Sequence, residues 1–279
     1  MLVAQELNLD GGNLVRMRFF HVDKLESSTK SKNQYCIAID EPILTLSNIV
    51  SRMDRHKYMN DNERIFRYMN KLRKVFWMIG DGVNQLHNQG VVHGRIDADS
   101  CGKFDDGWKL LNLIGSQRVG QPINANRLKH CPPPEAVHVS RRTGRVAVSK
   151  STEANVSVDI FGFGRLMFEV FTGKDIISVN SHKIADSDEI FLQALKNWDE
   201  DSLSTIVMEV ESVGVGKLAA DLVSRCLCPF PEHRPKNMEE VLSHPYWSES
   251  KHAGMSVSNH RRRKALSSKE REITRRFEA

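Results

Sequence analysis

The segment VDIFGFGRLMFEVFT, residues 158–172, constrains the fold more than any other part of the sequence. With about 100° between successive residues, its apolar side chains cover nearly the whole circumference of a helix, and such a helix is buried on all sides. It is too short, and too interrupted by Asp159, Arg165 and Glu169, to span a bilayer. We therefore predict the central helix of a globular domain, which ends at Gly173 because glycine adopts a positive φ at little cost.

Composition limits the class of protein. The chain has 279 residues, of which 40% are apolar and 27% charged, as in a globular protein with one large or two small domains. Its five cysteines are scattered and include no paired Cys-x-x-Cys units, so we expect reduced thiols in an intracellular compartment. The N-terminus, MLVAQELNLD, has no signal-peptide pattern, and no apolar run is long enough to predict a membrane span.

The net charge of +5 is concentrated at the C-terminal end. Residues 248–279 contain nine Lys or Arg and four Glu, whereas the first 247 residues contain 31 basic and 31 acidic residues and sum to zero. We expect a basic, disordered tail. Two alternatives stay open: a nuclear localisation signal at 261–264, and binding of RNA or an acidic membrane surface through 261–276.

Two β-rich runs near the N-terminus, residues 14–22 and 35–39, predict a hairpin, with the polar residues 23–34 between its strands. A tighter hairpin is predicted at 101–113, because an Asp-Gly pair is a favoured turn between two short strands. Residues 114–157 are expected to be mainly loop and contain the basic stretch RRTGR.

The clearest amphipathic helix is predicted at 61–88. Its apolar residues alternate at spacings of four and three, which places them on one face. Asn60 or Asp61 is expected to cap its start, and Gly90 to end it. A coiled-coil seam is the rival interpretation, but it lacks the charged flanking pattern. Further helices are expected at 188–198, 203–210, 217–227 and 238–243.

Five short motifs follow one another along the chain. They are Val92-His93, Lys109-Leu110-Leu111-Asn112, Pro133-Pro134-Glu135, DIFGFG at 159–164 and PEHRP at 231–235. In this order they resemble the large lobe of eukaryotic protein kinases, over about residues 13–247. The resemblance implies an α+β, kinase-like fold, with a residual small lobe at 1–40 (a helix end and a β-hairpin), a mainly helical large lobe at 41–247 and the tail at 248–279.

The resemblance also implies roles for residues that hold the fold. Glu135 and Arg234 are expected to form an ion pair that ties the segment around Glu135 to the later helices. Asp159 is expected to cap the central helix and to hydrogen-bond the backbone of the loop that starts at His93. The alternative is that Glu135 and Arg234 are unpaired surface charges.

The loop HGRIDADS, residues 93–100, differs from the kinase catalytic loop at its reactive positions. By the resemblance, Arg95 replaces the catalytic aspartate, Asp97 the lysine and Ser100 the metal-binding asparagine. An arginine cannot accept a proton. Asp97 and Asp99 lie two and four residues further on, about 6–13 Å away in an extended loop, so neither is expected to substitute.

The nucleotide site is also degenerate by this comparison. Asn112 stands where a metal-binding aspartate is expected, and a neutral amide binds Mg²⁺ more weakly. We find no glycine-rich loop and no phosphate-binding lysine before the residues that carry the resemblance. Asp40 and Glu41 occupy a hinge-like position. We expect no ATP or Mg²⁺ cofactor, and nucleotide binding without catalysis stays open.

These observations together predict a catalytically inactive kinase-like domain, a pseudokinase, that serves as a protein-binding scaffold or allosteric regulator in the cytoplasm, with the nucleus as the alternative. Two other functions are kept. One is an active Ser/Thr kinase that uses displaced groups or belongs to a truncated chain. The other is a nucleic-acid adaptor that acts through the basic tail.

Overall fold

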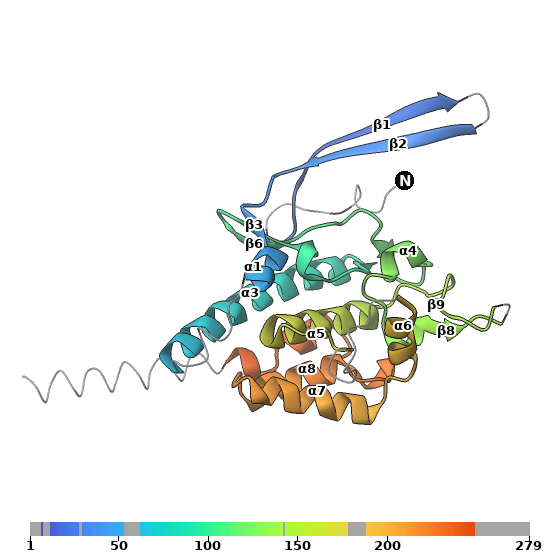
Figure 1. The fold of residues 1–279 in the computed structure, drawn as a ribbon. Helices are drawn as coiled ribbons and strands as arrows, with labels where there is room; N and C mark the ends of the chain where they lie inside the picture. The colour runs from blue at the N-terminus through green and yellow to red at the C-terminus, as the bar shows by residue number, and fades with distance from the viewer. Residues whose placement is uncertain are drawn as a thin grey trace, which may run out of the picture. The chain divides into compact units, whose positions relative to one another are not determined.

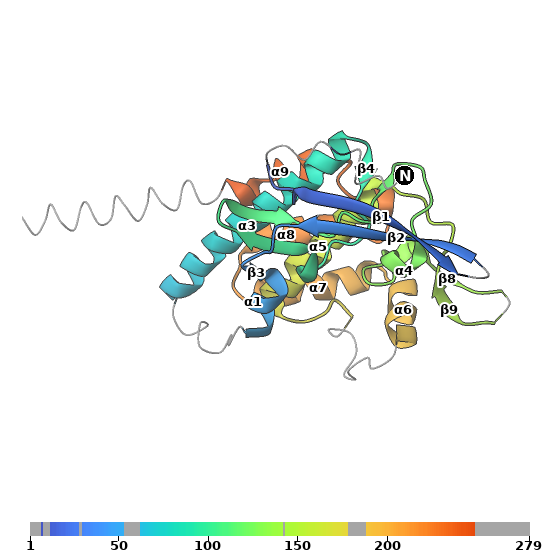
Figure 2. The ribbon, with the colours of Figure 1, turned by 90° about the horizontal axis from the view of Figure 1, so that it is seen from above.

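The computed structural model describes the backbone of Leu7 and of residues 12–27, 30–52, 62–141, 143–177 and 188–248. The side chains of these residues are described as well, except those of 17–27, 30–37, 52, 62–66 and 188. The chain divides into two compact units, Met1–Leu242 and Ser243–Ala279. The fold class is α+β, with helices and small antiparallel sheets (Figures 1 and 2). No helix of the described residues has the length and apolarity needed to cross a bilayer. The domain boundaries at 40 and 247 and the cytoplasmic location stay predictions.

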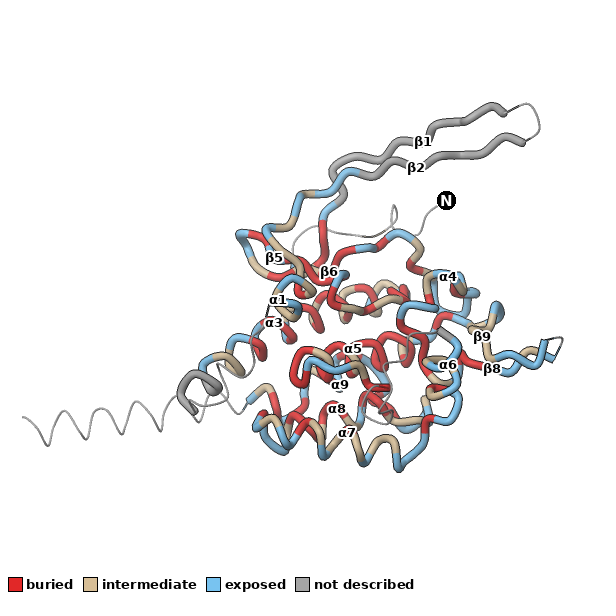
Figure 3. The backbone as a smooth tube through the Cα atoms, viewed as in Figure 1, coloured by how far each residue is buried: buried red, intermediate tan, exposed pale blue. Residues whose placement is uncertain are grey.

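The predicted central helix is α5 (Val156–Thr172), and fourteen of its seventeen residues are buried (Figure 3). Helices α3 (Asn62–Asn88), α7 (Glu200–Ser212) and α8 (Lys217–Cys226) pack around it. A Cβ atom on Gly164 would lie 2.6 Å from Cβ of Cys226, so glycine at this position lets α5 and α8 approach closely. Gly173 ends α5 with φ 68°, as predicted.

The remaining helices mostly match the sequence pattern. Gly90 follows α3 with φ 68°, whereas the predicted caps Asn60 and Asp61 lie outside the described residues. Helix α1 (Leu46–Arg52) was not predicted, because two turns are too short to show a helical period. The other helices are α4 (Ala125–Leu128), α6 (Asp188–Lys196) and α9 (Met238–Leu242). Short 3₁₀ turns lie at Ala98–Ser100, Pro134–Ala136, Pro231–His233 and Pro245–Trp247.

The N-terminal hairpin is present, but its strands are longer than predicted. Strands β1 (Met17–Ser27) and β2 (Lys30–Ile39) pair antiparallel as far as Ser27 opposite Lys30. Residues within 23–34, predicted to separate the strands, therefore form half of the cross-strand pairs, because the hydrogen bonds of a ladder come from the backbone and do not require apolar side chains.

The other sheets are small. Strands β3 (Leu44–Thr45), β5 (Cys101–Phe104) and β6 (Gly107–Leu110) form a three-stranded sheet, with β5 and β6 in the predicted tight hairpin. Strand β4 (Val91–Val92) pairs with β7 (Gln117–Arg118), and β8 (Val137–Val139) pairs with β9 (Val146–Val148). Residues 114–157 are mainly loop, as predicted, but they also contain β7, α4, β8 and β9, which were not predicted.

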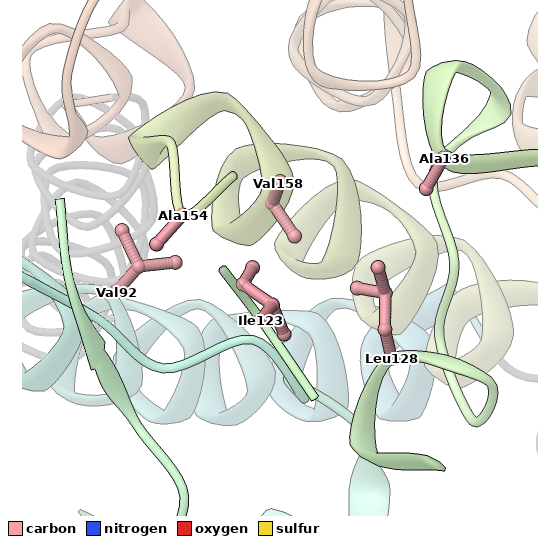
Figure 4. Close-up of a cluster of buried hydrophobic side chains, with 6 residues drawn as sticks. All are labelled: Val92, Ile123, Leu128, Ala136, Ala154 and Val158. Carbon is pink, nitrogen blue, oxygen red and sulfur yellow. The ribbon is translucent and has the colours of Figure 1, made fainter. Parts of the chain in front are cut away.

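A buried apolar cluster fixes the loop after β4 against α5 (Figure 4). Val92 from β4, Leu128 from α4 and Val158 from α5 are each at most 4% exposed. The other members are Ile123, Ala136 and Ala154. Because burial of these side chains joins three separate segments, the backbone at His93 starts from a fixed position.

Candidate functional site

The loop that begins at His93 is held by one buried carboxylate. Asp159, 1% exposed, accepts hydrogen bonds from the backbone N–H groups of His93 and Gly94, each at 2.7 Å. Its Oδ2 also lies 3.0 Å from Nε2 of His87. Burial acts to raise the pKa of Asp159, but the hydrogen bonds and neighbouring imidazoles outweigh it and hold the pKa below its usual value. The expected hydrogen bonds to this loop are therefore present.

Asp159 does not cap the central helix, and that part of the prediction is wrong. Helix α5 begins at Val156, two residues earlier than predicted, and its N-cap is Asn155. The side chain of Asn155 accepts a hydrogen bond from the backbone N–H of Ser157 at 2.9 Å. Asp159 already lies inside the first turn, so its carboxylate is free to reach the neighbouring loop.

His93 is a buried, neutral member of the same network. Its Nε2 donates to the carbonyl oxygen of Leu111 at 2.8 Å, and its Nδ1 accepts the backbone N–H of Arg95 at 3.2 Å. Burial, reinforced by the positive charge of Arg127, lowers the pKa of His93 to about 4. The ring therefore fixes two loop segments and is uncharged at neutral pH.

Arg95 and Asp97 form an ion pair within the loop. Nε of Arg95 lies 2.6 Å from Oδ2 of Asp97, and the two side chains are 26% and 22% exposed. The other oxygen of Asp97 accepts the backbone N–H of Ser100 at 2.8 Å, while Oγ of Ser100 accepts the backbone N–H of Asp97 at 2.9 Å. Both carboxylate oxygens of Asp97 are thus engaged, and Asp99 is exposed.

Arg127 is a site residue that the sequence analysis missed. From α4 it donates to the carbonyl oxygens of His93 at 2.8 Å, Asn112 at 2.6 Å and Ile114 at 2.5 Å. Burial lowers its pKa to about 10, so it stays charged at neutral pH. Its acceptors are backbone groups, which every residue type has, so no sequence signal marks it. Arg127 joins the His93 loop to the segment that holds Asn112.

The nucleotide-site candidates are less closely connected. Asn112 has φ 56° and is exposed, and its carbonyl oxygen accepts a hydrogen bond from Arg127, which also binds the carbonyl oxygen of His93. Asp40 is half-buried and Glu41 exposed, just after β2. Within the described ranges, no group of three or more His, Cys, Asp or Glu side chains is arranged to hold a metal ion. The tail residues 261–276 lie outside them.

The expected ion pair between Glu135 and Arg234 is present and bidentate. Nη1 and Nη2 of Arg234 each lie 2.8 Å from an oxygen of Glu135. The Arg234 side chain is fully buried, and its remaining hydrogen bonds go to carbonyl oxygens, including that of Ser157 in α5 at 3.1 Å. Its guanidinium also lies 4.8 Å from the ring centre of Phe161. The alternative of two unpaired surface charges is wrong.

The thiols near this loop are hydrogen-bonded to its backbone: Sγ of Cys101 donates to the carbonyl oxygen of Asp97 at 3.4 Å, and Sγ of Cys131 to that of Ile96 at 3.5 Å. Cys101, Cys131 and Cys226 are buried, Cys228 is half-buried, and all four are free. Burial raises the pKa of Cys131 to about 11 and that of Cys226 to about 12, so both stay protonated and unreactive. Cys36 lies among the residues whose side chains are not described.

Comparison of the sequence with protein-family models and with curated proteins finds no match. The function must therefore be argued from the site itself. The site offers a buried structural carboxylate, a neutral imidazole and two cations, Arg95 and Arg127. Its partly exposed carboxylate, Asp97, is committed to partners on both oxygens.

Proposed function

We propose that this chain is a catalytically inert protein-kinase-like domain, a pseudokinase, that acts as a protein-binding scaffold or an allosteric regulator. One observation carries the proposal. Arg95, at the position where the kinase resemblance places the proton-accepting aspartate, is a cation whose Nε lies 2.6 Å from Asp97. Phosphoryl transfer to a hydroxyl requires an anionic acceptor at that position, and a guanidinium cannot serve.

The neighbouring carboxylates are poor substitutes. A general base must come within about 3 Å of the proton it removes. Asp97 would have to give up Arg95 on one oxygen and the backbone N–H of Ser100 on the other. Loss of a general base alone lowers a rate by about 10²–10⁴. Asn112 in place of an anionic Mg²⁺ ligand lowers the expected activity further.

The kinase-like frame is supported by the contacts that hold it. Arg234 pairs with Glu135 across 99 residues, and Asp159 accepts from the His93 loop across 66 residues. Both contacts are ones that the resemblance to protein kinases predicts. A chain that keeps such contacts beside a loop without a proton acceptor fits a binding role better than a chemical one.

Two assays on the full chain test this proposal. The first measures transfer from γ-labelled ATP with Mg²⁺ to the chain itself and to a mixture of generic kinase substrates. The second follows the thermal unfolding midpoint during titration with ATP and Mg²⁺. We expect no transfer. A higher midpoint without transfer agrees with nucleotide binding by an inert domain, whereas transfer that is lost in Asp97→Asn or Asp99→Asn favours the alternative of an active kinase with displaced groups.

A further inference from the structure

The hairpin of β8 and β9 carries a concentration of positive charge that the proposed function does not use. From residue 137 to residue 151 the sequence contains four Lys or Arg and no Asp or Glu. Three of these cations, Arg141, Arg145 and Lys150, are in the described part of the chain, and all three are exposed. Since the first 247 residues sum to zero charge, this hairpin is a local departure from a balanced surface.

These three cations have no carboxylate partner among the described residues, unlike other arginines of the same unit. Arg165 pairs with Asp175 at 2.6 Å, and Arg225 pairs with Asp221 at 3.0 Å. The charges of the hairpin are therefore available to an external acceptor, and they lose no internal ion pair when they bind one.

The hairpin presents its charges from an ordered backbone. At the turn, the N–H groups of Gly144 and Ser140 donate to Ser140 and Arg145 respectively, each at 2.8 Å. At the base, the N–H of Ser149 donates to the carbonyl of Ala136 at 2.7 Å. Helix α6 packs against both strands and lies beside them in Figures 1 and 2. An ordered surface loses little conformational entropy on binding, which favours affinity.

An apolar face continues from the core onto this hairpin. Val137 faces Val148 and is 2% exposed. The next pair on the same face of the hairpin, Val139 with Val146, lies further out and leaves Val139 50% exposed. In α6, Ile190 is 48% exposed. Arginine is enriched at protein interfaces, and the buried core of an interface is more apolar than its polar rim. The hairpin has no Phe, Tyr or Trp on which a nucleotide base could stack, and its one ring is the imidazole of the exposed His138.

We propose that the described part of the β8–β9 hairpin, residues 137–141 and 143–148, is a docking surface for an acidic segment of a partner protein that also carries aliphatic residues. Its carboxylates pair with Arg141 and Arg145, and its aliphatic side chains cover Val139. This deepens the proposed scaffold function, since it names a docking surface and the chemistry of the partner. It does not depend on the absence of phosphotransfer, so a phosphotransfer assay and a docking assay can fail separately.

Fluorescence anisotropy with the full chain tests the docking surface. The probes are a fluorescein-labelled peptide that repeats Glu-Asp-Val-Glu, the same peptide with Gln and Asn in place of Glu and Asp, and single-stranded poly(U). The test variant is Arg141→Glu/Arg145→Glu. The matched control is Lys71→Glu/Lys74→Glu, which makes the same charge change at two exposed positions of α3. The basic tail is present in every sample, so its contribution is constant.

We expect the acidic peptide to bind the parent chain and the α3 control alike, and the hairpin variant to bind it about tenfold more weakly or worse, since two attractive pairs become repulsive. Val139→Ser should weaken peptide binding and leave poly(U) binding unchanged. Equal binding of the acidic and neutral peptides, equal losses in the hairpin and α3 variants, or failure of the acidic peptide to bind would overturn the proposal. Poly(U) binding that only the hairpin variant loses, without peptide binding, would instead assign the surface to nucleic acid. Far-ultraviolet circular dichroism of each variant establishes that it is folded.

Discussion

Two groups of polar side chains beside α5 use their hydrogen bonds in opposite ways. Arg234 and Asp159 bond to partners 99 and 66 residues away in the sequence. Arg95 and Asp97 bond to partners only two and three residues away. The first group therefore fixes the tertiary arrangement, and the second fixes only the shape of its own loop. The contacts that hold the loop in place are therefore separate from the contacts made by its own charged side chains.

The largest effect expected from this comparison is the loss of Arg234. Arg234→Ala should lower the free energy of unfolding by about 3–5 kcal/mol, because it removes a fully buried cation with a bidentate partner and leaves Glu135 unpaired. Urea unfolding measures it. The matched control is Arg225→Ala, which removes an exposed pair with Asp221 and should cost less than about 0.5 kcal/mol. Similar losses of unfolding free energy in the two variants would show that the buried, long-range pair stabilises the fold no more than an exposed, local pair does.

The pH dependence of stability should reveal the titration of the buried His93 imidazole. His93 has an ordinary pKa of 6.5 and a folded pKa of about 4, so between these values the unfolded chain binds more protons. The stability that His93 contributes is therefore fully present above pH 6.5. It is lost as the pH falls to 4, and the free energy of unfolding drops by about 3 kcal/mol in total. Urea unfolding at a series of pH values measures this slope. His93→Gln should flatten it in that window, and an unchanged slope would show that another group titrates.

Asp159→Asn should cost about 2 kcal/mol, because an amide nitrogen then faces a backbone N–H that had a carboxylate acceptor in a buried site. Thermal unfolding followed by circular dichroism measures the loss. Asp106→Asn is the control, since Asp106 is 67% exposed and its pair with Lys109 is local. If the two variants were equally stable, the anchoring role assigned to Asp159 would be wrong.

The smallest effect is expected in the loop itself. Arg95→Gln removes a half-exposed pair between neighbouring residues and should change the free energy of unfolding by less than about 1 kcal/mol. Chemical denaturation against the parent chain measures it. A loss as large as that of Arg234→Ala would mean that the loop, too, supports the tertiary arrangement.

The sequence predicted long and strongly patterned elements well. Helices α3 and α5 have a clear apolar pattern and a terminal glycine, so the sequence alone predicts them. The pair formed by Glu135 and Arg234 was expected from the resemblance to protein kinases and is present.

Other features leave little trace in a single sequence. Strands β8 and β9 have three residues each, too few to show a period. The N-cap of α5 is Asn155 and not the predicted Asp159, because the helix begins two residues before its apolar pattern suggests. Arg127 binds carbonyl oxygens that every residue carries, so only the folded backbone reveals it.

The most direct test of the account is single-turnover transfer from γ-labelled ATP and Mg²⁺ by the full chain, compared with the same chain after heat denaturation. The account predicts equal label in both samples, because in the proposed kinase-like frame Arg95 stands at the position where phosphoryl transfer needs an anionic proton acceptor. Label that accumulates only with the folded chain, and that disappears when Asp97 or Asp99 is changed to Asn, would contradict it.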